Sequence, residues 1–338
     1  MTENNWQRRW HPVLKEWVVI SARTSNRPWS GMEFNDSSKN KPQHDKDCYL
    51  CPRVERASGA SNPNYQSPWA FDNDFASLSL DAPTFVESKD PLRRIESAKG
   101  LCRVMCWHPR HDLSLAALDD QQMLDVVKLW KQEYQSLSET KEIQHILMFE
   151  NKGKEIGVSN PHPHGQIYAS AFIPKQIQEI RQSQAEYAQE HGSHLILDWL
   201  LKSQEDGLSV VENEFFIAAV PFAARFPYET WITSKRKLSH LGQLQDHELP
   251  ALASIYQEMA KRYNGLFKRE APNITLIQNA PVDSNSENDS WQFHIVMQPP
   301  LRDSSKLKYL AGFESGTNCI VNPVQPEQAA ASLRAVQL

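Results

Sequence analysis

Residues 160–167 read Asn-Pro-His-Pro-His-Gly-Gln-Ile, and an alternating apolar run continues from there to Phe172. Each proline favours an extended backbone at the residue before it. If the run is a strand, His162, His164 and Gln166 project from one face, because side chains alternate between the two faces. A single histidine in such a place can be a buried core residue. A His-x-His-x-Gln row at the mouth of a strand indicates a functional site instead.

The composition is typical of a soluble globular protein. The 338 residues suffice for two ordinary domains or one large one, and 40% of them are apolar. A net charge of −5 without a basic block does not favour nucleic acid as a partner. No apolar run approaches the ~18 residues that a membrane span needs. The N-terminus lacks the hydrophobic segment of a signal peptide, so we expect a cytoplasmic protein.

The cysteines do not suggest a disulfide framework. There are five, an odd number, in a chain without a secretion signal. Cys102 and Cys106 lie four positions apart in a predicted strand and share a face with Val104. Small buried residues are the expected role for both.

A Cys-x2-Cys pair at Cys48 and Cys51 predicts a zinc site. Such a pair needs two further ligands, and the chain has no second Cys-x2-Cys. Histidines are therefore the better candidates. His162 is one of them, and either His108 or His111 supplies the other. The alternative is a redox-active cysteine pair without a metal.

Two polar segments are candidates for substrate contacts. Asn151 follows a predicted strand, and with Ser159 and the backbone amides between them it is suited to hold a phosphate in front of His164. Residues 71–75 read Phe-Asp-Asn-Asp-Phe. This composition fits a pocket for a base and a ribose, and it equally fits an ordinary turn between two buried phenylalanines.

Two arginines, Arg23 and Arg27, follow a strand pattern within residues 6–20. Arginines just beyond a strand suit the recognition of phosphate or carboxylate. Solvated surface arginines are the equally good alternative from the sequence alone.

The periodicity predicts an α+β fold in which one unit occurs twice. Apolar residues at helical spacing, with Asp119 or Asp120 as the cap, predict a helix over 119–137. A strand and the His-x-His run follow it, and the same order returns later in the chain. The two copies span residues 119–172 and 246–298. The other expected elements are helix 246–267, a helical segment over 174–205, and strands over 145–149, 214–220, 229–233, 274–278 and 291–297.

These residues together resemble the galactose-1-phosphate uridylyltransferase family, a branch of the histidine-triad superfamily. The resemblance covers nearly the whole chain, and its most specific string is Ser-Asn-Pro-His-Pro-His-Gly-Gln at 159–166. The other matching motifs are Asn26-Arg27-Pro28-Trp29, Cys48-Tyr49-Leu50-Cys51, Gly59 with Asn62-Pro63, Asn73-Asp74-Phe75, Glu150-Asn151-Lys152-Gly153, Pro299-Pro300-Leu301 and Lys308-Tyr309-Leu310-Ala311-Gly312-Phe313-Glu314.

The resemblance implies a fold and a reaction. The fold is a pair of histidine-triad-like halves, residues 1–195 and 196–338, whose antiparallel sheets form a half-barrel-like body flanked by helices. In the reaction, His164 attacks the α-phosphorus of UDP-glucose and forms a uridylyl-histidine intermediate. Galactose 1-phosphate then takes the uridylyl group in a ping-pong double displacement. Gln166 stabilises a phosphoryl oxygen.

The resemblance also implies ligands for each remaining motif. One structural zinc ion per chain is held by Cys48, Cys51, His111 and His162. The uridine pocket comprises Tyr49, Phe71, Asn73, Asp74, Phe75 and Val104, and the phosphate loop comprises Asn151, Gly157 and Ser159. The hexose phosphate contacts Arg27, Lys308, Tyr309, Phe313 and Glu314. The C-terminal members of this set reach the site of a partner subunit, so a homodimer is expected.

The chain departs from the family pattern at a second metal site. Some members bind a second metal with a Glu and three histidines, and the matching positions are Ile180, Gln278, His294 and Val296. We therefore expect that site to be lost. Thr24 stands where one of the paired arginines is expected, and the sequence after Glu314 differs from that of the best-known members, which leaves the acceptor sugar open.

Two other functions fit the same motifs. One is a related nucleotidyltransferase or phosphorylase, for instance one that acts on ADP-glucose with phosphate through the same histidine. The base pocket around residues 49–57 and 71–75 would distinguish it. The other is a zinc-stabilised nucleotide-binding protein without turnover.

Overall fold

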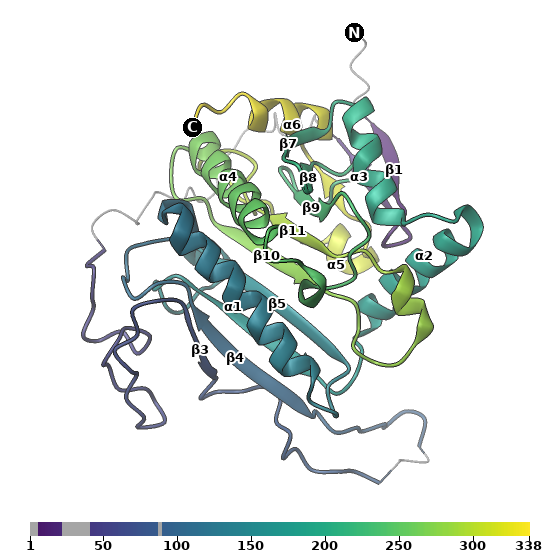
Figure 1. Cartoon of the computed structure of the whole chain (residues 1–338). Coiled ribbons are helices and arrows are strands. Elements are labelled where there is room, and N and C mark those ends of the chain that lie inside the picture. The colour runs from purple at the N-terminus through teal and green to yellow at the C-terminus, as the bar shows by residue number, and fades with distance from the viewer. Residues whose placement is uncertain (1–5, 22–40, 87–89) are drawn as a thin grey trace.

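One antiparallel sheet of nine strands passes through both halves of the part of the chain that the structure describes (Figure 1). The structure is a computed structural model, and it describes residues 6–21, 41–86 and 90–338. In spatial order the strands are β3 (Trp69–Asp72), β4 (Gly100–Cys106), β6 (His164–Ser170), β5 (His145–Lys152), β10 (Asn273–Gln278), β11 (His294–Gln298), β9 (Thr230–Ser234), β8 (Phe216–Ala219) and β7 (Ser209–Glu212).

The order of the elements confirms the predicted repeat. Helix α1 (Asp120–Ser138) precedes β5 and β6, and helix α4 (Leu249–Phe267) precedes β10 and β11. The two units meet at the centre of the sheet, where β5 pairs with β10 in antiparallel register, Met148 opposite Ile277. The predicted α+β fold with a duplicated unit is therefore confirmed, and the two units share one continuous sheet.

Helices α1 and α4 pack side by side on one face of this sheet (Figure 1). Asp119 caps α1 through a capping box with Gln122, which satisfies the free amides of the first turn. Met123 and Trp130 of α1 share the main hydrophobic core with Ile167 and Ala169 of β6. The core face of β6 is therefore the face opposite to His164 and Gln166.

On the other face of the sheet, helices of the described residues cover the C-terminal half, and residues 48–65 pack on Val104 and Cys106 in the N-terminal half. Helices α2 (Lys175–His191) and α3 (Leu195–Glu205) bury Ile180 and Leu200 against Trp231 and Val296. The prediction of a single helical segment over 174–205 is wrong, because the structure has two helices there. The first helix, α2, ends at Gly192, which adopts the left-handed conformation with φ 66°.

A second, small sheet joins the two ends of the described chain. Strands β1 (Gln7–His11) and β2 (Glu16–Ile20) form a hairpin, and β12 (Val321–Asn322) adds to β2 in parallel. The remaining elements are α5 (Phe313–Thr317), α6 (Pro326–Arg334) and short 3₁₀ turns at Leu115–Ala117, Lys154–Ile156, Leu241–Gln243 and Ser286–Ser290. Among the described helices, none combines the length and the apolar character that crossing a bilayer requires.

Candidate active site and metal centre

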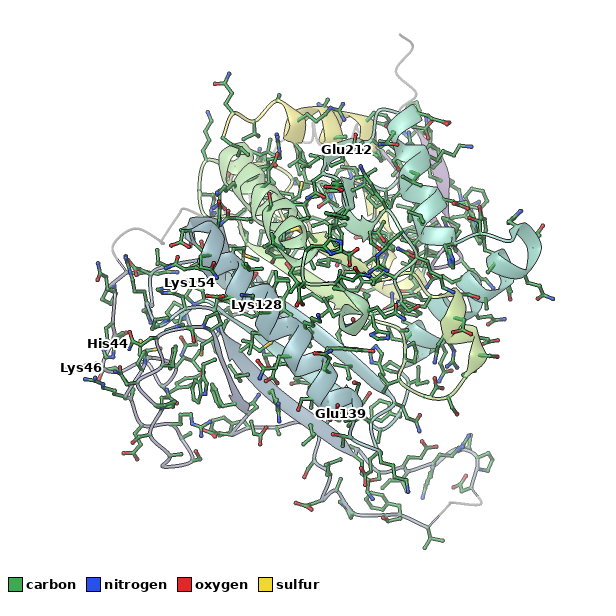
Figure 2. The ribbon with its side chains drawn as sticks, viewed as in Figure 1. His44, Lys46, Lys128, Glu139, Lys154 and Glu212 are labelled. Atoms are coloured by element: carbon green, nitrogen blue, oxygen red, sulfur yellow. The ribbon has the colours of Figure 1, made fainter. Side chains whose placement is uncertain are left out.

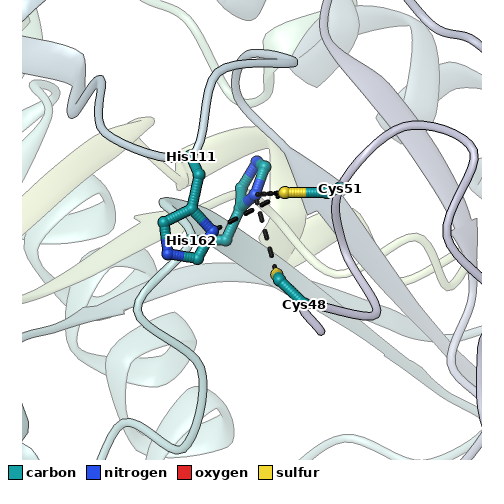
Figure 3. Close-up of side chains that lie close together, drawn as sticks. All are labelled: Cys48, Cys51, His111 and His162. Carbon is teal, nitrogen blue, oxygen red and sulfur yellow. Dashed lines mark hydrogen bonds between the residues drawn. The ribbon is translucent and has the colours of Figure 1, made fainter. Parts of the chain in front are cut away.

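Four side chains that are far apart in the sequence converge on one buried point. Cys48 and Cys51 come from a turn, His111 from the loop after β4, and His162 from the segment before β6 (Figure 3). The Sγ atom of Cys51 lies 3.6 Å from Nδ1 of His111 and 3.5 Å from Nδ1 of His162. Zinc–ligand bonds of ~2.3 and ~2.0 Å at tetrahedral angles place such atoms about 3.6 Å apart. The cluster therefore fits a tetrahedral metal ion.

Outer contacts orient these ligands toward a common centre. The Nε2–H group of His162 donates to the carbonyl of His108 at 2.9 Å, which leaves Nδ1 as the metal-facing nitrogen. Burial lowers the pKa of His162 to about 4, so the ring is neutral and able to ligate. Burial raises the pKa of the Cys51 thiol to about 12. A bound cation would stabilise the thiolate and so offset this effect of burial. The donor set thus matches that of a metal site.

The structure also separates His108 from His111, which the spacing alone left open. The ring of His111 belongs to the cluster. Nε2 of His108 instead lies 3.1 Å from the side-chain nitrogen of Gln122. Nδ1 of His108 accepts a hydrogen bond from the backbone amide of Arg110. His108 contributes to the centre only through its carbonyl.

His164 begins β6 directly beyond the metal centre. Its Nδ1–H group donates to the carbonyl of His162 at 2.7 Å, so the Nε2 lone pair is left free. Burial lowers the pKa of His164, while the bond to the carbonyl opposes this effect. The ring is therefore neutral near pH 7. It lines a cleft of about 380 Å³ together with Asn151 and Ser159.

Gln166 lies in a row of side chains on the face of the sheet opposite to α1, part of which is covered by residues 48–65. The register places Phe71 opposite Val104, Val104 opposite Gln166, and Gln166 opposite Phe149. Two predicted uridine-pocket residues, Phe71 and Val104, therefore share the face of Gln166. His164 and Gln166 share one strand face as expected, whereas His162 lies before β6 and its ring belongs to the metal cluster.

The segment after β3 holds the other residues predicted for the nucleoside. Asn73 accepts a bond from the amide of Phe75, and the Asp74 carboxylate accepts one from the amide of Ser58. Phe75 is 76% exposed, so the segment is not a turn between two buried phenylalanines. Tyr49 is also exposed.

Arg56 lies within the stretch 49–57 assigned to the base pocket, but no contact was predicted for it individually. Its guanidinium lies 4.4 Å from the ring centroid of Phe71 and 3.5 Å from the carboxylate of Asp74. Arg56 lies in a loop seventeen positions before Asn73, and no local pattern in the sequence marks it. Its contacts with Phe71 and Asp74 form only because β3 packs beside that loop.

The predicted phosphate loop leads from β5 to β6. Asn151 and Ser159 line the cleft with His164, and Gly157 ends a 3₁₀ turn in the left-handed conformation with φ 79°. Lys154, labelled in Figure 2, is exposed at this turn. The cleft is also lined by charged residues for which no ligand contact was predicted, namely Lys41, Asp45, Glu150, Lys152, Lys154, Glu155, Arg269 and Glu270.

The four C-terminal residues predicted for the hexose phosphate lie outside the cleft of His164. Lys308 and Glu314 form a buried ion pair, while Tyr309 and Phe313 are more than half exposed. Within the described chain, none of these four residues lines the cleft. Arg27 lies outside the described residues.

The positions expected to have lost a second metal site are packed as a core. Ile180 and Val296 belong to one hydrophobic cluster, and the ring of His294 stacks on Trp231 with centroids 4.9 Å apart. The Nδ1 atom of His294 bonds to the carbonyl of Gln292. Gln278 lies opposite His294 on the neighbouring strand.

Gly165 lies between the predicted catalytic residues His164 and Gln166, and it lets Trp107 pack closely against β6. A Cβ atom at this position would lie 2.3 and 2.5 Å from ring atoms of Trp107. The indole of Trp107 donates to buried Glu150 at 2.9 Å, so it is not free to move aside. Only glycine lets Trp107 pack directly under the strand that carries His164 and Gln166.

The variant Gly165→Ala tests this packing. Because the added methyl group overlaps a fixed indole, we expect the free energy of unfolding to fall by about 1–3 kcal/mol. Denaturant titration measures the loss. Gly316→Ala is the matched control, since a Cβ there meets nothing within 4 Å. Equal stability of the two variants would contradict the packing argument.

Comparison with known proteins gives matches over the whole chain. The family model for the N-terminal domain of galactose-1-phosphate uridyl transferase matches residues 1–174, and that for the C-terminal domain matches residues 179–338. A galactose-1-phosphate uridylyltransferase of Haemophilus influenzae is 36% identical over 334 residues, which cover 97% of this chain and 94% of the relative. The enzyme of that name from Rattus norvegicus is 36% identical over 335 residues, which cover 96% and 86%.

Solved structures share the fold. A structure described as that of a uridylyltransferase superposes with a TM-score of 0.78 at 25% identity, and covers 97% of both chains. An ADP-glucose phosphorylase from Arabidopsis thaliana superposes with a TM-score of 0.79 at 22% identity, and covers 98% of this chain and 100% of that one. On the strength of both family models and of relatives that are similar along their whole length, the chain belongs to the galactose-1-phosphate uridylyltransferase family.

Proposed function

We propose that this chain exchanges UMP between UDP-glucose and galactose 1-phosphate, with His164 as the nucleophile. The observation that carries the proposal is the bond from Nδ1–H of His164 to the carbonyl of His162, which leaves Nε2 free in a cleft beside the predicted phosphate loop. A neutral imidazole in this tautomer is a good nucleophile at neutral pH.

The reaction proceeds in two displacements at one phosphorus atom. Nε2 of His164 attacks the α-phosphorus of UDP-glucose, the bond to the bridging oxygen breaks, and glucose 1-phosphate leaves. A phosphate oxygen of galactose 1-phosphate then attacks the uridylyl-histidine, the P–N bond breaks, and UDP-galactose forms. Positive charge grows on the ring when the P–N bond forms, and the His162 carbonyl stabilises it through Nδ1–H.

Gln166 and the phosphate loop stabilise the phosphoryl oxygens in both steps. Gln166 lies two residues after His164 on the same face of β6, where its amide donates to a non-bridging oxygen. The proposed uridine contacts are Tyr49, Phe71, Asn73, Asp74, Phe75 and Val104. The proposed phosphate contacts are Asn151, Gly157 and Ser159.

We also infer that the metal is a single structural zinc ion held by Cys48, Cys51, His111 and His162. Four protein ligands leave no open coordination position, so the ion supplies rigidity. It holds the ring of His162, whose carbonyl receives the bond from His164. The metal centre therefore supports the tautomer of His164 from two residues away.

Metal analysis tests this assignment. We expect about one zinc ion per chain and little iron, as the tetrahedral Cys₂His₂ set suggests. In Cys51→Ser the zinc content should fall steeply and the thermal midpoint should drop, whereas Cys319→Ser, outside the cluster, should retain both. Stoichiometric iron in the wild type, or full zinc in Cys51→Ser, would contradict the assignment.

Labelling tests the nucleophile and the donor together. UDP-glucose carrying ³²P in the α-phosphate should leave an acid-labile label on His164, and ADP-glucose should leave none. His164→Gly should lose hexose exchange by about a thousandfold or more. Added imidazole should restore part of the activity, because it enters the space of the lost ring.

Three results would point elsewhere. Label from ADP-glucose alone would favour the phosphorylase. Label from neither donor would remove the covalent mechanism. Equal binding of UDP-glucose by wild type and His164→Gly, with no exchange by either, would favour a binding protein without turnover.

We propose further that the chain acts as a homodimer in which Lys308, Tyr309, Phe313 and Glu314 serve the partner's site. Tyr309 and Phe313 are exposed at 53% and 58%, which suits a contact outside the chain. The buried Lys308–Glu314 pair holds the segment between them in shape.

Mixing two inactive variants tests this arrangement. Tyr309→Ala removes the contact to the partner's hexose phosphate, and His164→Gly removes the nucleophile. After random exchange of subunits, half of the dimers carry one intact site, so activity should return to about a quarter of the wild-type level. Mixtures of each variant with itself are the control, and a mixture no more active than these would overturn the shared site.

A further inference from the structure

The predicted phosphate loop is held from the other half of the chain. Residues 153–159 leave β5, and residues 268–272 join α4 to β10. The two loops meet because β5 and β10 are neighbours in the sheet, with Lys152 opposite Asn273. Side chains of both loops line the same cleft as His164.

An ion pair between Glu155 and Arg269 joins these two loops. The side chain of Glu155 is 5% exposed and that of Arg269 is 8% exposed, and an Nη2–H group of Arg269 donates to Oε1 of Glu155. A charge buried to this degree is costly without its partner. The pair therefore ties the 3₁₀ turn at Lys154–Ile156 to the loop that follows α4 in the second unit.

Two further contacts reinforce the tie. A Cβ atom on Gly153 would lie 2.6 Å from Cβ of Pro272, so the loops touch there without space for a side chain. The carboxylate of Glu270 lies 3.8 Å from Nζ of Lys152 and 3.7 Å from Nζ of Lys41. Residues 270–272 thus contact the neighbouring segments both by van der Waals packing and by ion pairs.

The charge of Glu155 matters for an anionic substrate. It stands two residues before Gly157 and four before Ser159, both proposed to contact phosphate. A bare carboxylate in this partly desolvated cleft would repel a diphosphate. Arg269 cancels that charge and at the same time fixes the loop.

We propose that Arg269 is a positioning residue, which sets the nucleoside-diphosphate loop through Glu155. The second unit, which lacks the His-x-His row, then acts as the support for the site of the first. This inference rests on the proposed function, since the loop's ligand is the diphosphate of the donor substrate. Neither Arg269 nor Glu155 was predicted from the sequence as a site residue.

Four variants test the proposal by steady-state kinetics with UDP-glucose. Arg269→Gln should lower kcat/KM for UDP-glucose about tenfold or more, chiefly through KM, because an unpaired carboxylate remains beside the phosphates. Glu155→Gln should lower kcat/KM less, since the group left unpaired is then the positively charged guanidinium of Arg269. The double variant should have a higher kcat/KM for UDP-glucose than Arg269→Gln, because the carboxylate that repels the diphosphate is gone.

Arg181→Gln is the matched control for a broken ion pair. Arg181 pairs with Asp283 at 2.9 Å, its side chain is 13% exposed, and it does not line the cleft. Its KM for UDP-glucose should equal that of the wild type. A purely structural role for Arg269 would lower stability in both variants and leave both KM values unchanged, which would overturn the proposal.

Hydrogen exchange gives a readout that does not depend on turnover. In Arg269→Gln, the amides of residues 153–159 should exchange faster, while those of β6 should not. Unchanged exchange in this loop would overturn the proposal even if the wild type is active. If the wild type takes no label from UDP-glucose, the proposed function fails, and the exchange data still decide whether the loop depends on Arg269.

Discussion

The hydrogen bond from the ring of His164 to the carbonyl of His162 is the interaction on which the rest of the site depends. It selects one tautomer, and so decides which nitrogen faces the cleft. The accepting carbonyl belongs to a residue whose ring is fixed on its other side by the carbonyl of His108. One residue thus joins the candidate metal centre to the proposed nucleophile through its own backbone. Pro161 and Pro163, which flank His162, favour the extended backbone that makes this geometry possible.

The two units have the same order of elements, but their exposed chemistry differs. Both place a helix on the core face, where α1 and α4 lie side by side. On the other face, α2 and α3 close over the second unit, and His294 is stacked against Trp231. In the described part of the first unit, no pair of helices lies on this face, where residues 48–65 pack on Val104 and Cys106 and the cleft beside His164 stays open. The two units therefore differ in how the same face of the sheet is covered.

Several features of the fold and the site could be predicted from the sequence because they depend on local rules. The helix over 119–137 follows from apolar periodicity and from Asp119 as a cap, and the structure has it at Asp120–Ser138. The alternation of His164 and Gln166 follows from strand geometry. The break at Gly192 was missed, because one glycine in a polar helical pattern does not by itself show whether a helix ends there.

Other features depend on contacts between distant segments. Spacing could not separate His108 from His111, because they are three residues apart in one loop and only packing against Cys51 selects the second. Arg56 and Arg269 carry no motif, and each gains its role from a loop that a different strand brings beside it. The charged residues that line the cleft were not predicted for the same reason, since segments distant in the sequence supply them.

By itself, the sequence determined the repeated α+β unit, the residue types of the reaction and the family, because periodicity and a rare string of adjacent residues are local properties. Tertiary structure alone decided which segments cover each face of the sheet, which histidine completes the metal cluster and how the second unit holds the loop of the first. Those outcomes depend on pairings such as β5 with β10, which join residues more than a hundred positions apart. Ion pairs and ligand sets form where such pairings place charges together, and no local pattern encodes that placement.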